Sequence, residues 1–171
     1  MSGTGYRHRL KRTGGGGLSS SAALELAIAH LLEAISGQQV HSHDRIQACV
    51  QAERQMAGIP CGIMDQTVVD TAEAGHAMVL DCANQDATPV PLALDNISLL
   101  VVHSGVSHAL AEGAYAQRRL ECEQVAEGLG VSTLRDVVLD DIERLASASL
   151  RKRVRHVVTE NARVQEAVVT I

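Results

Sequence analysis

The pattern of apolar positions predicts a chain made mostly of helices. Between residues 20 and 36 most side chains are apolar, and Gly37 follows as a natural helix end. The large apolar side chains that follow helical spacing there are Leu24, Ile28, Leu31, Leu32 and Ile35. Because this segment is apolar nearly all round, we expect its helix at the centre of the fold. Further helices are expected over about 42–57, ending at Gly58, and over about 109–128, 139–147 and 150–169.

Shorter apolar runs predict the strands. HAMVLDC at 76–82 and ISLLVVHS at 97–104 are expected to be strands, and PVPL at 89–92 is a weaker extended piece. The chain shows no internal repeat and no low-complexity linker. Many helices with few strands indicate the α+β fold class.

The second expected helix has a carboxylate on its apolar face. Glu53 occupies the position that completes a stripe formed by Ile46, Cys49, Val50, Met56 and Ala57. A buried carboxylate that is neither paired nor bound to a metal costs several kcal/mol of desolvation. We therefore expect a positive group to face Glu53.

A turn is expected after this helix, in the segment GIPCGIMDQ at 58–66, because glycines and a proline interrupt regular structure there. A short helical run follows through Val68 and Val69, and Asp65 lies on the same face as these valines. Asp65 is therefore a second carboxylate that needs a partner, close to a glycine that lets a ligand approach the backbone.

A run of glycines and serines precedes the first expected helix, in GGGGLSSSAALE at Gly14–Glu25. Successive glycines let backbone N–H groups turn toward one point, and the helix that follows adds free N–H groups and a positive dipole end. Ser19, Ser20 and Ser21 add hydroxyls that can bind phosphate oxygens or a metal ion. The segment lacks the Lys-Ser/Thr pair of a Walker loop and the spacing of a Rossmann motif. It is either an anion cradle or a glycine-rich connector with a serine N-cap.

Glu53 and Asp65 fit two interpretations. Beside a phosphate cradle, two inward carboxylates suit Mg²⁺ binding and the activation of a hydroxyl. Alternatively, each carboxylate forms a salt bridge to one of the chain's arginines.

One face of the expected helix at 109–128 combines an aromatic ring with positive charge. Its residues, spaced i, i+3, i+4 and i+7, are Tyr115, Arg118, Arg119 and Cys122. For the arginines a solvated basic face is favoured slightly over a ligand contact. For Tyr115 a ligand contact and a core position are equally compatible with the pattern.

Composition and charge argue against several functions. The 171 residues, 46% hydrophobic and 20% charged, fit one ordinary domain or two small ones. Phe and Trp are absent, so the core must be aliphatic, and two tyrosines with a net charge of −5 do not favour binding to nucleic acid or to an acidic membrane. No apolar run approaches the ~20 residues of a membrane span, and no signal peptide is recognisable. We expect a cytoplasmic protein.

Cysteine and histidine do not point to a further site. The four cysteines have no CxxC spacing and are expected to be small buried hydrophobes in a reducing compartment: Cys49, Cys61, Cys82 and Cys122. His41 and His43 have HxH spacing without further clustered ligands, and we expect them to be exposed at a helix start.

Two of these segments resemble a known family. GGGGLSSSAALE resembles the phosphate-binding motif of the GHMP small-molecule kinases, and GIPCGIMDQ is similar to the active-site segment of the galactokinases. The resemblance continues through GHAMVLDC, VVHSGVSHALAEGAYAQRR and RVRHVVTEN, and covers nearly everything from Gly14 to Ile171. It implies a kinase that uses ATP and Mg²⁺ to convert galactose to galactose 1-phosphate.

The resemblance also implies roles for individual residues. Asp65 would be the catalytic carboxylate beside the anomeric hydroxyl, Gly62 would offer backbone contact to the sugar, and Tyr115 would line the sugar pocket. Ser21 and Glu53 would hold Mg²⁺. The residues expected to wrap the ATP phosphates are Gly15, Gly16, Gly17, Leu18, Ser19, Ser20 and Ser21.

The same resemblance implies a partial GHMP kinase fold. We expect an atypical leader at 1–13, part of the N-terminal, ATP-binding domain at 14–88, and the start of the C-terminal domain at 89–171. The family's sugar-gripping segment, which supplies an arginine partner to the catalytic aspartate, and its second glycine-rich motif are not recognised in the sequence. We therefore expect an incomplete fold without useful galactokinase activity. The alternatives are a non-catalytic galactokinase-like protein that binds nucleotide or sugar, and a GHMP kinase for a related sugar.

Overall fold

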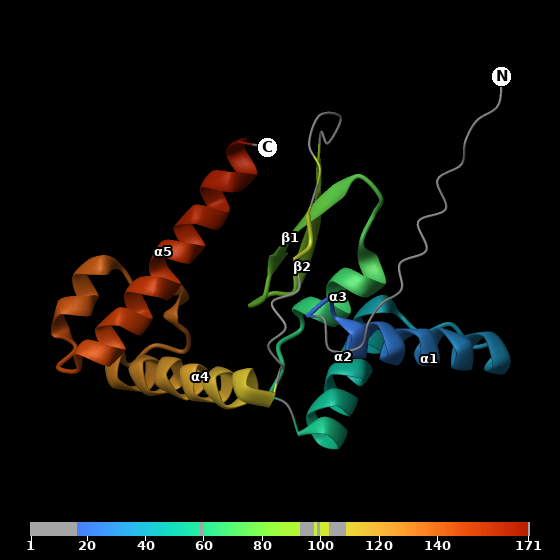
Figure 1. The fold of residues 1–171 in the computed structure, drawn as a ribbon, viewed down its shortest axis with the longest axis horizontal. Helices are drawn as coiled ribbons and strands as arrows, with labels where there is room; N and C mark the ends of the chain where they lie inside the picture. Colours follow the sequence, from blue (N-terminus) through green and yellow to red (C-terminus); the bar gives the residue numbers. More distant parts are fainter. Residues whose placement is uncertain (1–16, 59, 93–97, 99, 103–108, 171) are drawn as a thin grey trace. The chain divides into compact units, whose positions relative to one another are not determined.

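The structure is a computed structural model, and it describes residues 17–58, 60–92, 98, 100–102 and 109–170. The chain divides into two compact units, one comprising residues 1–71 and 101–106 and the other comprising residues 72–100 and 107–171. Figure 1 shows the helices and strands in chain order. Helices with a small sheet define an α+β protein, as the sequence predicts.

The first unit is built from helices α1 (Ser20–Ser36), α2 (Ser42–Ala52) and α3 (Met64–Thr71), each of which contacts the other two. α1 has the bounds expected from the sequence. It ends where Gly37 adopts a left-handed conformation (φ 69°), from which its N–H donates to the carbonyl of Glu33.

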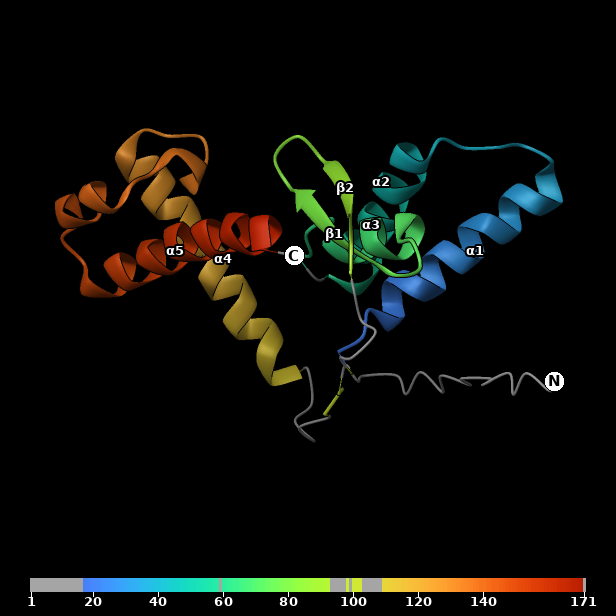
Figure 2. The ribbon, with the colours of Figure 1, turned by 90° about the horizontal axis from the view of Figure 1, so that it is seen from above.

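The expected central position of α1 is wrong for the described residues. Ala22 and Leu26 are its buried side chains, whereas Leu32 is 60% exposed and Ile35 is 75% exposed. In Figures 1 and 2 the C-terminal end of α1 extends away from α2 and α3. Since these two helices are its main contacts among the described residues, they cover one side of α1 and leave its other apolar side open.

The end of α2 departs from a regular helix. Residues Glu53–Ala57 form a π-helical turn that ends at Gly58, which is left-handed with φ 68°. The predicted burial of Ile46, Cys49, Val50 and Glu53 is confirmed, but Met56 is 88% exposed. A π turn holds more residues than an α turn, so it shifts the phase of the stripe and rotates Met56 outward.

The second unit contains a hairpin and a helical cluster. Strands β1 (His76–Asp81) and β2 (Asp86–Pro91) pair antiparallel, with His76 opposite Pro91 and Asp81 opposite Asp86. The helical elements are α4 (Ala109–Leu129), the 3₁₀ turns η2 (Leu134–Asp136) and η3 (Leu139–Arg144), and α5 (Ala148–Thr170). The helices expected at 109–128 and 150–169 are confirmed, whereas the one expected at 139–147 is a shorter 3₁₀ segment.

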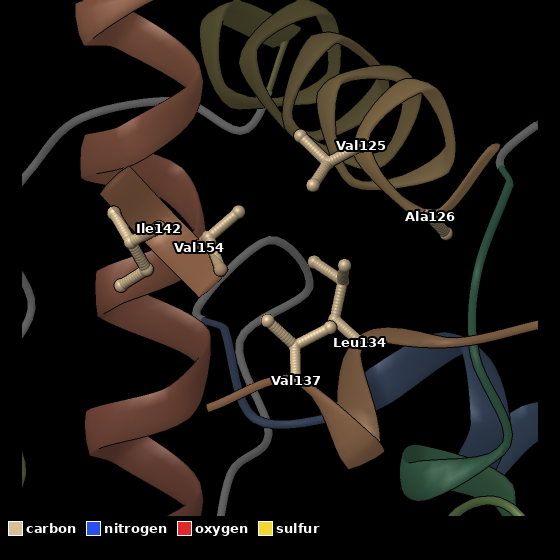
Figure 3. Close-up of a cluster of buried hydrophobic side chains, with 6 residues drawn as sticks. All are labelled: Val125, Ala126, Leu134, Val137, Ile142 and Val154. Atoms are coloured by element: carbon tan, nitrogen blue, oxygen red, sulfur yellow. The ribbon is translucent and has the colours of Figure 1, made fainter. Parts of the chain in front are cut away.

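The core of this unit is aliphatic, as the absence of Phe and Trp requires. Figure 3 shows its buried side chains, which come from α4, η2, η3, α5 and the connection after η2: Val125, Ala126, Leu134, Val137, Ile142 and Val154. Arg135 in η2 donates from Nη1 to Oδ2 of Asp81 at 2.7 Å and so connects this cluster to the hairpin.

The strand expected at 97–104 is wrong at its described positions. Ser98 and 100–102 are not in a strand, and Leu100 and Val102 are 86% and 76% exposed. The remaining positions lie outside the described residues. An apolar segment becomes a strand only when a neighbour accepts its backbone hydrogen bonds, and the described sheet consists of β1 and β2. The weaker piece at 89–92 is confirmed through Pro91, as part of β2.

The cysteines are free thiols, and their burial is uneven. Cys49 is buried, Cys61 and Cys122 are partly buried, and Cys82 is exposed. The expectation of burial is wrong for Cys82 because it lies in the turn between β1 and β2. None of the helices in the described ranges is long and apolar enough to cross a membrane.

Candidate active site

The glycine-serine segment leads into the N-terminus of α1, as expected. Gly17 is left-handed (φ 70°), Ser19 is also left-handed (φ 52°), and the helix begins at Ser20. Gly14, Gly15 and Gly16 lie outside the described residues. The Ser19 side chain makes no capping hydrogen bond to the helix, so the serine N-cap alternative is wrong. Its hydroxyl instead hydrogen-bonds a side chain of another helix.

Ser19 contacts Asp65, one of the two predicted carboxylates. Its Oγ donates a hydrogen bond of 2.9 Å to Oδ1 of Asp65, which lies in the first turn of α3 and is partly buried. The pair joins positions 46 residues apart in sequence. Asp65 therefore lies beside the start of α1, although nothing in the local sequence pairs the two.

Ser21 contacts Glu53, the other predicted carboxylate. Its Oγ donates to Oε1 of Glu53 at 2.7 Å, and Glu53 is only 7% exposed at the start of the π turn. The expected positive partner is wrong for the described residues: Glu53 accepts from the Ser21 hydroxyl and, at 2.6 Å on Oε2, from the Gln66 side-chain amide, and the neutral Cys61 thiol also lies within hydrogen-bonding reach. Burial and the Glu53 carboxylate together raise the pKa of the nearby Cys61 thiol.

Gln66 and Glu25 belong to the site and were not predicted from the sequence. Gln66 is fully buried, and its Nε2 also donates to Oε2 of Glu25 at 3.1 Å. Burial raises the pKa of Glu25, and the charge of Glu53 adds to that rise, while the bond from Gln66 opposes it. The available signal was spacing, because Glu25 follows Ser21 by four residues and so shares its helix face.

The buried face of α3 is polar. Gln66 and Thr67 are buried, while Val68 is 38% exposed. Asp65, Val68 and Val69 share one face of α3, as the pattern predicts, but this face is at most partly buried, whereas the buried side chains of α3 are polar. Thr67 donates to the carbonyl of Ile63 at 2.8 Å, which satisfies its buried hydroxyl.

An ion-pair network fixes the three helices relative to one another. Arg45 of α2 donates from Nε and Nη2 to the two oxygens of Asp70 on α3, at 2.8 and 2.9 Å, and from Nη1 to Glu33 of α1 at 2.9 Å. Burial alone would raise the pKa of Asp70, but the bonds from Arg45 and Ser42 outweigh it and lower that pKa. Arg45 thus pairs with Asp70 and Glu33, not with Glu53 or Asp65 as the salt-bridge alternative proposed.

The remaining predicted residues lie in different surroundings. Gly62 is exposed just before α3, and a Cβ built on it would meet no heavy atom within 4 Å. Tyr115 lies on α4 in the second unit and is 48% exposed, which argues against the core alternative. On the same helix, exposed Arg119 pairs with Glu123 at 2.8 Å, as a solvated basic face would. His41 and His43 are exposed at the start of α2, as predicted.

Within the described part of the chain, no group of three or more His, Cys, Asp or Glu side chains could hold a metal ion by itself. The structure instead brings together two oxygen-bearing groups that could share a cation. They are the Ser21 hydroxyl and the Glu53 carboxylate, 2.7 Å apart. Such a pair can bind a cation that arrives with further oxygen ligands of its own.

Comparison with known proteins shows which class of protein the chain resembles. Residues 13–71 match the family described as GHMP kinases N terminal domain. The galactokinase of Homo sapiens is 42% identical over 156 residues, which are 90% of this chain and 40% of that protein. The galactokinase of Streptomyces coelicolor is 43% identical over 161 residues, covering 90% of this chain and 42% of that protein.

A solved structure agrees. The crystal structure of Lactococcus lactis galactokinase complexed with galactose superposes with a TM-score of 0.75 at 25% identity, and covers 92% of this chain and 44% of that one. The fold is therefore a partial fold of the GHMP kinases. Within that class the resemblance is to the galactokinases, as the motifs predict, and the chain spans about 40% of the length of the curated relatives it matches.

Proposed function

We propose that this chain carries the phosphate-binding loop, the metal-binding carboxylate and the catalytic carboxylate of a galactokinase-type kinase. The reaction transfers the γ-phosphoryl group of ATP to the anomeric hydroxyl of galactose and yields galactose 1-phosphate and ADP. The similarity to galactokinases over 90% of the chain supports this reaction, as does the galactose bound in the Lactococcus lactis relative. The cytoplasmic location expected from the sequence is part of the same proposal.

One observation supports the proposal more than any other. Two hydroxyls at the start of α1, those of Ser19 and Ser21, each hydrogen-bond one carboxylate, Asp65 and Glu53 respectively. A helix N-terminus preceded by glycines binds phosphate through its free N–H groups and dipole. A phosphate bound there would be close enough to both carboxylates for a single metal ion to contact the phosphate and a carboxylate together. Phosphoryl transfer needs this arrangement.

Ser21 and Glu53 fit the metal role. The partners of Glu53 in the described structure are neutral donors, so its negative charge is not cancelled and is available to a cation. Mg²⁺ favours few protein oxygens together with phosphate oxygens and water, and when bound it offsets the charge of the transferred phosphoryl group. Gly17, Leu18, Ser19 and Ser20 would bind the phosphates, together with Gly15 and Gly16.

Asp65 fits the catalytic role. Its carboxylate is partly exposed and accepts a hydrogen bond from Ser19, which leaves Oδ2 for an incoming sugar hydroxyl. There Asp65 would accept the hydroxyl proton or stabilise the attacking oxygen electrostatically. The open space around Gly62 suits backbone contact with the sugar, and half-exposed Tyr115 would line the sugar pocket.

The proposal is tested on the purified chain with ATP, Mg²⁺ and galactose, by equilibrium binding and by a coupled assay of ADP release. We expect Mg²⁺-dependent ATP binding without galactose-dependent ADP release, because the sugar-gripping motif of the family is not recognised in these residues. Absence of Mg²⁺-dependent ATP binding would overturn the proposed function. Turnover in the ordinary kinase range would confirm the reaction and overturn the expected inactivity.

A further inference from the structure

Gln66 is a fully buried side chain that joins three elements of the first unit. From α3 its Nε2 donates to Glu53 at the end of α2 and to Glu25 of α1, at 2.6 and 3.1 Å. A side-chain amide has two N–H donors, and here each carboxylate takes one of them. The amide therefore separates two carboxylates that would otherwise repel each other.

The amide is neutral, and this distinguishes it from the usual partner of a buried carboxylate. An arginine or lysine in its place would cancel the charge of Glu53 and compete with any cation. The amide satisfies one oxygen of Glu53 by hydrogen bonding and leaves the charge in place. The site thus keeps a buried negative charge beside the glycine-serine segment.

The Gln66 amide lowers the stability of the fold in one respect. Its Oε1 is buried and has no hydrogen-bond partner among the described residues. An unsatisfied buried acceptor lowers stability, and an apolar side chain of similar size would avoid that penalty. Packing alone does not account for a glutamine here, whereas the two bonds from its nitrogen do.

The bond to Glu53 also sets the direction of that carboxylate. With Oε2 taken by Gln66, Oε1 is directed to the Ser21 hydroxyl at the start of α1. Gln66 directly follows Asp65 in α3, so the same bond fixes the helix turn that presents Asp65 to Ser19.

We propose that Gln66 is a positioning residue that orients Glu53, and through it the Ser21–Glu53 oxygen pair, for a cation. This inference rests on the proposed function, in which that pair binds Mg²⁺. Replacing a residue that positions a metal-binding carboxylate commonly weakens metal binding 10–100-fold.

The first experiment compares Gln66→Met with a matched control, Gln117→Met. Gln117 lies exposed on α4 and donates to Glu121 at 3.5 Å, so the control makes the same substitution away from the site. The readout is the Mg²⁺ concentration that gives half of maximal ATP binding. We expect it to rise at least about tenfold in Gln66→Met and to stay unchanged in Gln117→Met. A lower melting temperature with an unchanged Mg²⁺ requirement would show a merely structural role and overturn the proposal.

A second variant distinguishes the positioning of Glu53 from the effect of negative charge at the site. Gln66→Glu keeps the shape and adds a carboxyl group beside Glu53 and Glu25. If only negative charge mattered, it would tighten Mg²⁺ binding; if the amide positions Glu53, it weakens the binding. Tighter binding would overturn the proposal. This variant also gives the answer if Gln66→Met does not melt cooperatively.

A ligand-free measurement separates failure of this inference from failure of the proposed function. In a double-mutant cycle of Ser21→Ala and Gln66→Met, unfolding equilibria should show a coupling of roughly five-fold, because both groups act on Glu53. If the wild-type chain binds no ATP but the coupling is present, the proposed function fails and the positioning of Glu53 stands. Additive effects would overturn the positioning itself.

Discussion

The hydroxyl of Ser21 donates a 2.7 Å hydrogen bond to the buried carboxylate of Glu53. Ser21 is in the first turn of α1, and Glu53 begins the π turn that ends α2. The bond brings a buried charge to the N-terminus of a helix preceded by glycines. A negative group is favoured at such a helix end, because the N-terminus is the positive end of the helix dipole.

Loss of the Ser21 hydroxyl should destabilise the first unit. Ser21→Ala leaves one oxygen of Glu53 without its donor, and we expect the free energy of unfolding to fall by about 1–2 kcal/mol in urea titrations. Ser36→Ala, at the exposed opposite end of α1, is the matched control and should have a much smaller effect. Equal effects of the two variants would contradict a role for the Ser21–Glu53 bond.

The Arg45–Asp70 pair should be the main ionic contribution to this unit. The Asp70 side chain is only 1% exposed, so Arg45→Met removes the main cationic partner of a buried carboxylate, which keeps only its contacts with Ser42 and His30, and should cost about 3–5 kcal/mol. The control Arg144→Met removes an exposed pair with Asp141 and should cost about 0–1 kcal/mol. Chemical denaturation near neutral pH measures both.

The same pair predicts a pH dependence. The folded-state pKa of Asp70 is lowered, so its contribution to stability is present above the ordinary aspartate pKa of about 3.9 and is lost as pH falls through the folded value. We expect the free energy of unfolding to drop below about pH 4 in the wild type, and to drop less in Asp70→Asn. Parallel pH curves for the two proteins would contradict this account.

The two sides of α1 should respond differently to truncation. Leu26 is 2% exposed and Leu32 is 60% exposed on the same helix. Leu26→Ala should cost about 2–5 kcal/mol, whereas Leu32→Ala should cost less than about 1 kcal/mol. If Leu32→Ala were equally costly, that side of α1 would be covered in solution.

Part of this organisation can be predicted from the sequence, where one local pattern dominates. The burial of Glu53 follows from an apolar stripe, and the start of α1 follows from glycines before an apolar helix. The apolar stripe predicts a buried Met56, but the π turn changes the helix phase, and the spacing of apolar residues does not reveal such turns. Gln66 was missed because its role depends on contacts with two other helices, and an uncharged polar residue gives no signal of burial.

Contacts between distant segments decide which apolar runs become strands and how much of a helix is buried, and the sequence pattern does not show these contacts. An apolar run such as 97–104 is compatible with a strand, but pairing decides the outcome, and its described positions are unpaired. α1 was expected at the centre because its sequence is apolar all round, yet sequence does not show how much of a helix its neighbours cover.

Substitutions of Asp65 and of Glu53 should affect ATP binding differently. Asp65→Asn is expected to leave Mg²⁺-dependent ATP binding within about threefold of wild type, because Asp65 is assigned to the sugar hydroxyl and not to the metal. In a full-length counterpart the same change should abolish turnover. Loss of ATP binding with turnover preserved would reverse the assignment of roles.

The most direct test of the site is the Mg²⁺ dependence of ATP binding in Glu53→Gln, measured by calorimetry on the whole chain. Glu53→Gln keeps the size of the side chain and removes the charge. The account predicts that the half-saturating Mg²⁺ concentration rises at least about tenfold. The matched control Glu73→Gln, at an exposed position after α3, should leave it unchanged. Equal Mg²⁺ dependence in wild type and Glu53→Gln would contradict the assignment of Glu53 to the metal, and with it the central claim.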